Sequence, residues 1–170
     1  RMHYAQGRLI TALIQNRIAA VCMHTNLDAA AGGVNDCLAL ALGLMNIVRL
    51  DEESGIGGVG SLTEPMDLAA FASYVKKRLG ANGVRYANGG REVHKVAVGG
   101  GACGEYAALA RDLGCDTFVT ADLKYHDFQN AAPWGLNLID AGHFPTEDVV
   151  CPQLVNLLED RFPALTIIKS

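Results

Sequence analysis

The 170-residue sequence is 50% hydrophobic and 19% charged, which is typical of a globular protein and predicts one domain over residues 1–170. Its net charge of −4 gives no general attraction to nucleic acid or to an anionic membrane, so neither is an expected partner. The chain has no apolar run long enough to span a bilayer. Its five widely spaced cysteines form no CxxC motif, which indicates a reduced, cytoplasmic protein.

Helical and strand-like patterns alternate along the chain, which predicts an α/β or α+β layered fold. The turn Asn88-Gly89-Gly90 predicts a hairpin, and the glycine-rich stretch 51–60 is expected to be irregular. In chain order the predicted elements are a helix over 7–16, a strand over 18–23, a helix over 35–42, a strand over 46–50, the helix 68–79, strands over 84–87 and 93–98, a helix ending near 114, a strand over 117–120, a helix over 126–132, strand 136–139, a helix from 145 that restarts at 152, and strand 166–169.

Two segments share one pattern, a histidine followed four residues later by a carboxylate. His24 precedes Asp28, and His143 precedes Glu147; each histidine comes shortly after a predicted strand. Imidazole nitrogen and carboxylate oxygen are common protein ligands for zinc, iron and manganese. The two pairs therefore predict one composite metal site. The alternative is that each histidine only forms ordinary hydrogen bonds within a loop.

A third polar cluster, Asp122 to Asp127, follows the predicted strand 117–120. In it, His126 is a candidate proton shuttle near pH 7, and Lys124 is a candidate phosphate-binding group. The alternative is a solvated loop in which Asp127 caps a short helix.

The glycine-rich segment Gly99–Gly104 lies between a predicted strand and a predicted helix. It suits either an anion-binding turn or, more simply, a tight turn that requires small residues. His94 alternates with Val93 and Lys95 and is expected at an exposed strand position. The absence of a G-x-S-x-G motif from the sequence disfavours serine-hydrolase chemistry.

Three of these segments together resemble the signature of a known family. The segment His24-Thr25-Asn26-Leu27-Asp28, the cluster 122–127 and the segment 140–143 with Glu147 are similar to those of the NIF-three-like dinuclear-metal family. Many of its members carry the name GTP cyclohydrolase 1 type 2 homologue. The resemblance implies sheets flanked by helices, a toroidal homo-hexamer, and two divalent metal ions in each subunit.

By motif position, the resemblance implies that Asp28, His143 and Glu147 are metal ligands. His24 is implied to support them or to be a further ligand, and His126 lies near the pocket. The family also contributes a consecutive histidine pair from an upstream segment, and this sequence contains no His-His. We therefore expect that an N-terminal portion is absent from residues 1–170, and that a second ion requires it.

Two functions follow from this reasoning. The first is a metal-dependent hydrolase of nucleotides or phosphorylated small molecules, in which Lys124 and His126 are the candidate catalytic residues. The second is a non-enzymatic protein that stores or delivers metal, or acts as a regulatory partner, within a hexameric ring.

Overall fold

A single mixed sheet forms the centre of the computed structural model, which describes residues 5–169. In the described chain the six strands have the order β1-β2-β4-β5-β6-β3; β4, β5 and β6 are parallel, and the remaining neighbours are antiparallel. The strands are β1 (Met45–Arg49), β2 (Gly58–Met66), β3 (Arg85–Ala87), β4 (Val93–Val98), β5 (Thr117–Thr120) and β6 (Asn137–Asp140).

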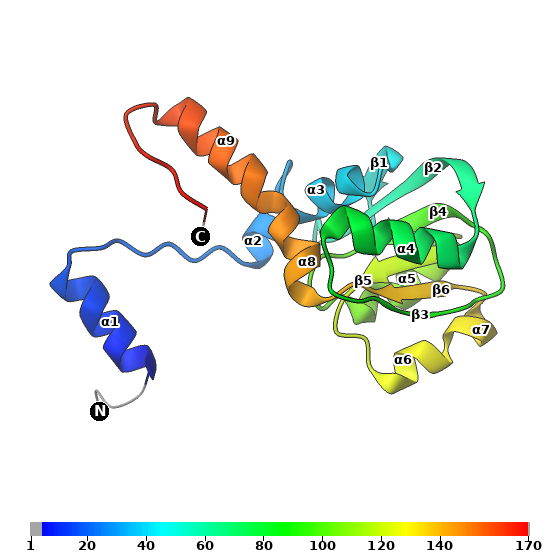
Figure 1. Cartoon of the computed structure of the whole chain (residues 1–170). Helices are drawn as coiled ribbons and strands as arrows, with labels where there is room; N and C mark the ends of the chain where they lie inside the picture. The colour runs from blue at the N-terminus through cyan, green and yellow to red at the C-terminus, as the bar shows by residue number, and fades with distance from the viewer. Residues whose placement is uncertain (1–4, 170) are drawn as a thin grey trace.

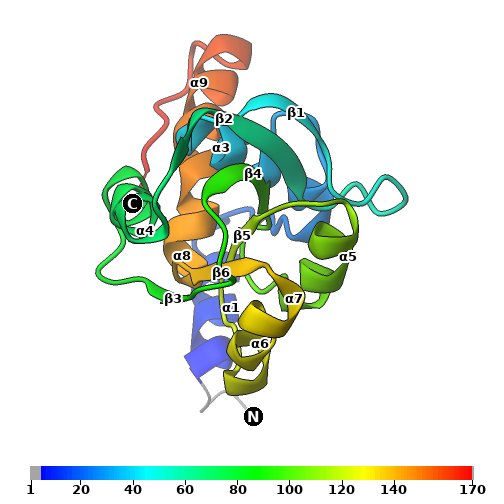
Figure 2. The same ribbon diagram turned by 90° about the vertical axis from the view of Figure 1, so that its right-hand side faces the viewer.

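Helices cover both faces of this sheet, as the α/β prediction requires (Figure 2). Successive strand residues point to opposite faces, so Val119 packs beneath one layer of helices and Phe118 beneath the other. The first layer is α3 (Val34–Ala41) and α4 (Leu68–Leu79). The second is the 3-10 helix η1 (Gly104–Tyr106) with α5 (Ala107–Asp112), α6 (Tyr125–Gln129) and α7 (Ala131–Trp134).

The boundaries of α4 illustrate how local chemistry sets an element. The Asp67 carboxylate accepts hydrogen bonds from the amides of Ala69 and Ala70, at 2.9 and 3.1 Å, and so caps the first turn. Gly80 ends the helix in the left-handed conformation, with φ of 63°. The predicted helix 68–79 is therefore confirmed at both ends.

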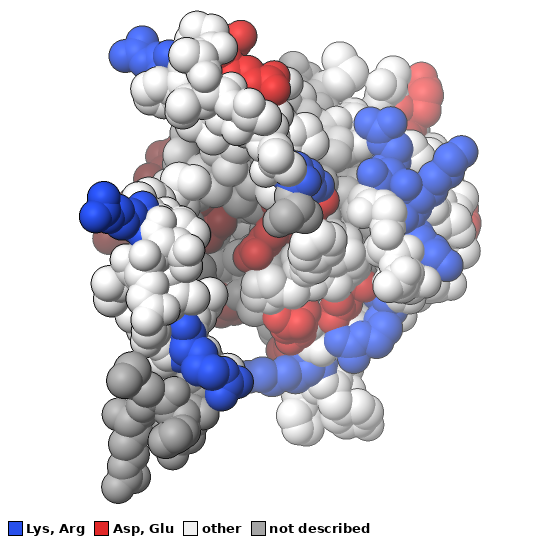
Figure 3. Space-filling model, turned by 60° about the vertical axis from the view of Figure 1, so that its left-hand side comes forward, with Lys and Arg blue, Asp and Glu red and all other residues white. Residues whose placement is uncertain are grey.

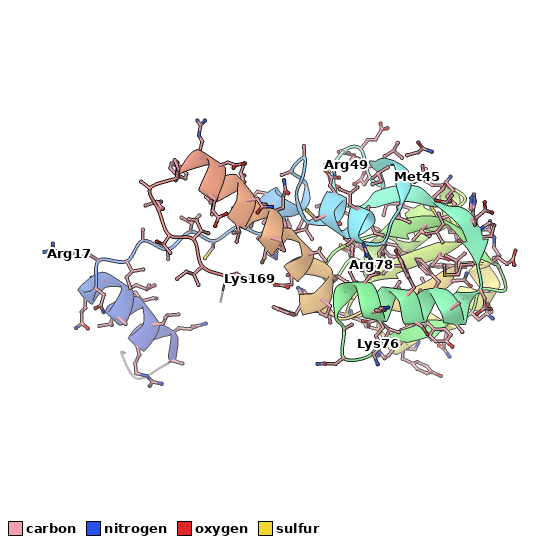
Figure 4. The ribbon with its side chains drawn as sticks, turned by 45° about the horizontal axis from the view of Figure 1, so that its top comes forward. Arg17, Met45, Arg49, Lys76, Arg78 and Lys169 are labelled. Atoms are coloured by element: carbon pink, nitrogen blue, oxygen red, sulfur yellow. The ribbon has the colours of Figure 1, made fainter. Side chains whose placement is uncertain are left out.

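Both ends of the described chain extend away from the sheet. Helix α1 (Ala5–Gln15) and helix α9 (Cys151–Arg161) have no buried residues and project from the body (Figure 1). The C-terminal segment folds back along α9, where Lys169 pairs with Asp148 at 2.6 Å (Figure 4). Between α9 and the sheet lie α8 (His143–Glu147) and the 3-10 helix η2 (Asp148–Val150).

The predicted strands 18–23 and 166–169 are wrong for this structure, because neither segment has a neighbouring strand within residues 5–169. Their apolar side chains are exposed instead, as at Val21 and Ile168. An apolar run signals a need for burial, but a strand also requires a partner for its backbone groups.

Three further predictions are corrected. The segments 84–87 and 93–98 form strands but no hairpin, because β3 pairs with β6 and β4 pairs with β2 and β5. The stretch 51–60 is not wholly irregular, since β2 begins at Gly58. The helix expected over 35–42 is α3, which begins one residue earlier at Val34 with Gly33 at its N-cap, and the Asn35 side chain is used elsewhere.

No helix in the described part, residues 5–169, is both long and apolar enough to cross a membrane.

Candidate metal site

The parallel strands β4, β5 and β6 end at the same edge of the sheet, and the loops that follow them carry the candidate site. Backbone hydrogen bonds join these loops. The Ala121 amide donates to the Gly101 carbonyl at 3.0 Å, and the Ala141 amide donates to the Thr120 carbonyl at 2.9 Å. Outside the carboxyl ends of parallel strands is where ligands bind in open α/β sheets.

His143 begins α8 and is held between two carboxylates. Its Nδ1 lies 2.6 Å from the Asp122 Oδ2, and its Nε2 lies 3.0 Å from the Glu147 Oε1. The hydrogen bond to Asp122 is the largest cause of a raised pKa for His143, and the Glu147 carboxylate adds to it. The helical spacing of four residues puts His143 and Glu147 on one face of α8.

Asp28 approaches the same place from the short helix α2 (Thr25–Asp28). It lines one cavity of about 240 Å³ together with His24, His143 and Glu147. Burial raises the pKa of Asp28, and the charge of Glu147 raises it further, while His24 and His143 lower it. The four residues singled out by the two His-x3-carboxylate patterns therefore meet at one cavity.

The glycine-rich loop after β4 forms a wall of this cavity. Two of its amides are already bonded within the protein: Gly100 donates to the Asn35 Oδ1 and Gly101 to the Thr146 Oγ1, both at 3.0 Å. These groups are not free to hold an anion, so the structure favours the tight-turn interpretation. A side chain at Gly101 would place its Cβ 2.5 Å from the Glu147 Oε1, so the Glu147 carboxylate would have to move from its present position.

Lys124 and His126 are separated from the histidine–carboxylate cluster. Lys124 lines an adjoining cavity with Glu105 and Asp122. His126 is exposed on α6, and its Nδ1 lies 3.1 Å from the Gln129 Oε1. The Asp127 carboxylate accepts from the Lys124 amide at 2.7 Å; it does so from the third position of α6, and the N-cap expected at Asp127 is Lys124. His94 is exposed on β4, as expected.

Sequence reasoning assigned no structural role in the site to three residues that build it. Asp122 orients His143; Asn35 donates to the Asp28 carbonyl at 2.9 Å and so fixes α2 to the glycine-rich loop. Asp140 pairs with Arg85 and accepts from the Leu123 amide at 3.1 Å and the Gly142 amide at 3.0 Å. Asp122 and Asp140 could have been found from their places at or just after the ends of predicted strands.

The donor chemistry suits a divalent cation. With Nδ1 held by a carboxylate, the Nε2 of His143 is the nitrogen left for a metal, an arrangement common among metal-bound histidines. Cys103 also lines the cavity, but burial raises the pKa of its thiol to about 12, so it stays protonated at neutral pH. Among residues 5–169, however, no three such side chains are already arranged as a complete coordination site.

The fold and the site define an α/β protein with a histidine–carboxylate cluster at the carboxyl edge of its parallel strands. The family model described as Duf34/NIF3 (NGG1p interacting factor 3) matches residues 1–170. The chain belongs to this family, which confirms the resemblance seen in the sequence.

Individual relatives agree with this assignment. A Clostridium perfringens protein called GTP cyclohydrolase 1 type 2 homolog is 35% identical over 161 residues, which cover 91% of this chain and 62% of the relative. This chain thus spans less than two thirds of that relative.

Solved structures share the fold. A Staphylococcus aureus hypothetical protein has a TM-score of 0.86 and 29% identity, covering 95% of this chain and 67% of that chain. A Bacillus cereus protein related to NIF3 has a TM-score of 0.87 at 24% identity, covering 96% and 73% of the two chains. The predicted NIF-three-like fold is confirmed.

Proposed function

We propose that this protein binds a divalent metal ion through Asp28, the Nε2 of His143, and Glu147. The hydrogen bond between Asp122 and His143 is the observation that carries the proposal, because it turns Nε2 toward the Glu147 carboxylate. Mixed histidine and carboxylate donors suit zinc, iron or manganese. Two ions in each subunit would need donors beyond these three.

We further propose that the site hydrolyses a nucleotide or another phosphorylated small molecule. A bound divalent ion would supply Lewis acidity, which polarises a phosphoryl oxygen and acidifies water. Asp122 would hold His143 in one orientation throughout, since its carboxylate bonds Nδ1. Lys124, in the adjoining cavity, would attract an anionic group of the substrate.

A role in metal storage, delivery or regulation is the second candidate. It is favoured by the position of His126, whose ring contacts Gln129 on exposed α6 rather than the donor cavity. A binding protein needs no separate group to transfer protons. The two candidates use the same donors and differ only in turnover.

Elemental analysis of the purified protein tests the metal proposal. Glu147→Gln and Asp28→Asn should each lower the metal content per chain while far-UV circular dichroism stays unchanged. His94→Ala is the matched control, because His94 is exposed on β4 and does not line the cavity that contains the proposed donors. Unchanged metal in both carboxylate variants would sink the ligand assignment.

Turnover is measured separately, on metal-loaded protein with a panel of nucleotides and phosphoesters. Hydrolysis that falls in Glu147→Gln supports the enzyme. Metal transfer to an apo-acceptor without any hydrolysis supports the binding protein instead.

The homo-hexameric ring and the cytoplasmic location also stay proposals. Exposed apolar side chains on α1 and α9, such as Ile14 and Leu157, support assembly, since burying them is favourable. Five free cysteines support a reducing compartment. Light scattering on the purified protein tests the ring, and a monomer at micromolar concentration contradicts it.

A further inference from the structure

A second, larger cavity adjoins the candidate metal donors. Its volume is about 470 Å³, which lies within the range of small-molecule sites. It shares His24, Asp28 and Glu147 with the donor cavity, so a single ligand can reach both. Most of the remaining wall is apolar. It comes from the segment 21–23, from Leu27, Val34, Phe144 and Val150, and from Cys151 and Leu154 of α9.

Part of the apolar wall belongs to the folded body, whereas the segment 21–23 and helix α9 supply the rest. Val34 of α3 and Val150 of η2 are only 3% and 5% exposed, so the floor of the cavity is fixed by packing. Phe144 differs, because it is 72% exposed although it directly follows His143. An aromatic ring left open to solvent beside candidate donors is available to stack against a ligand.

The charged side chains that line this cavity are all acidic. They are Asp28, Glu147 and Asp148, and the carboxylate of Asp148 is paired with Lys169. Figure 3 shows acidic side chains within the recess between the projecting segments and the body. An anionic group is therefore repelled by these carboxylates unless a cation is present, whereas a neutral ring suits the apolar lining.

Resting on the proposed function, we infer that this cavity binds an aromatic ring whose attached phosphate reaches the metal donors. A phosphorylated sugar without a ring of this kind would leave the apolar wall and Phe144 in water. The substrate class is therefore a nucleotide or an aryl phosphate rather than a sugar phosphate. Both share a planar ring linked to phosphate, and the probes below distinguish them.

Isothermal titration calorimetry tests the inference. The 170-residue protein is first loaded with Mn²⁺ and is then titrated, in separate experiments, with adenosine monophosphate, phenyl phosphate and ribose 5-phosphate. The two ring compounds should bind about tenfold tighter than ribose 5-phosphate, since stacking one base on an aromatic side chain is worth about this factor. Tighter binding of adenosine monophosphate than of phenyl phosphate assigns the cavity to a nucleobase; equal binding assigns it to aromatic rings in general.

Phe144→Ala should remove the tighter binding of the two ring compounds and leave the affinity for ribose 5-phosphate unchanged. Phe162→Ala is the matched control, because Phe162 is also exposed but does not line the cavity. Leu154→Asp adds a charge to the apolar wall and should likewise lower the affinity for the two ring compounds. Equal affinity for all three probes, or no effect of Phe144→Ala, overturns the inference.

Failure of the metal proposal is recognised independently. Adenosine carries no phosphate, so its binding to metal-free protein reports only on the cavity proposed to hold the aromatic ring. Saturation-transfer NMR measures this binding. A saturation-transfer signal that is present in the wild type and disappears in Phe144→Ala supports the cavity even where no metal binds. Normal metal content without any adenosine signal overturns the cavity and leaves the metal site standing.

Discussion

The carboxylate of Asp122 lies 2.6 Å from the Nδ1 of His143, and the backbone of Asp122 has a φ of 55°. This left-handed conformation is uncommon for a residue other than glycine, although aspartate tolerates it better than most. Asp122 follows β5 closely, and this backbone turns its side chain toward α8. The next amide, that of Leu123, donates to Asp140, so the end of β6 helps to hold the turn.

Asp122→Asn should bring the pKa of His143 down toward its ordinary value, because the hydrogen bond with Asp122 is the main cause that raises it. Two-dimensional NMR of the imidazole resonances of metal-free protein measures this. Metal affinity should also fall, by about 10- to 100-fold, since the orientation of His143 is lost. Asp127→Asn, in the adjoining helix α6, should change neither; an unshifted His143 titration in Asp122→Asn contradicts the assignment.

The raised pKa also fixes the sign of a pH effect on metal-free protein. Protonated His143 stabilises the fold fully below its unfolded pKa of about 6.5, and this contribution is lost as pH rises through the higher folded pKa. Urea unfolding of wild type and Asp122→Asn should therefore differ more at pH 5.5 than at pH 9. A difference that grows with pH would be the wrong sign.

Gly101→Ala should damage the site as well as the backbone. The residue has φ of 67°, which costs an alanine roughly 1–2 kcal/mol, and its Cβ would meet the Glu147 carboxylate. Gly114→Ala is the control, because Gly114 has φ of 76° with no heavy atom within 4 Å of an added Cβ. Both variants should lose similar stability in urea, but only Gly101→Ala should lose metal. Equal metal content in the two would contradict the close approach.

Asp140→Asn should destabilise the protein by about 1–3 kcal/mol. The buried Asp140 carboxylate pairs with Arg85 and accepts hydrogen bonds from two backbone amides, and the substitution removes its charge. Asp140 is buried, whereas Arg85 is largely exposed, which keeps the loss below that of a fully buried pair. Asp112→Asn tests an exposed pair with Arg111 and should cost less than about 1 kcal/mol. Denaturant midpoints that do not separate the two variants would refute this ranking.

Asn35→Ala should loosen Asp28. The side chain joins the Asp28 carbonyl to the Gly100 amide, and without it both groups lose a buried partner, at about 1–3 kcal/mol. Amide hydrogen exchange should accelerate in residues 25–28, and metal affinity should decrease. Asn16→Ala removes an exposed hydrogen bond at the end of α1 and is the control. Unchanged exchange in α2 would show that Asn35 does not hold it.

Much of the fold followed from local signals in the sequence. Asp67 and Gly80 specify where α4 begins and ends, and the predicted strand 117–120 is observed as β5 over the same four residues, all of them buried. Pairing was harder. The turn Asn88-Gly89-Gly90 suggested a hairpin, but β3 lies at the far edge of the sheet, which no local pattern reports.

The site was predicted in part. Both His-x3-carboxylate pairs line one cavity, as the sequence suggested, but their geometries differ. His143 and Glu147 share one helical face, whereas His24 precedes α2 and Asp28 ends it. The role of Asp122 depends on a left-handed backbone and on contact with a residue 21 positions away, and neither is encoded in local spacing.

The parallel register of β5 and β6 has one more consequence. Thr120 is paired with Asp140, so the residues that follow each strand leave the sheet at the same level. If β6 were shifted by one residue against β5, His143 would move by about 3.3 Å relative to Asp122. The same shift would turn each side chain of β6 to the opposite face of the sheet. Insertions or deletions within β5 or β6 would therefore separate Asp122 from His143. Changes of length near β1, at the other end of the strand order, would leave this pair in place.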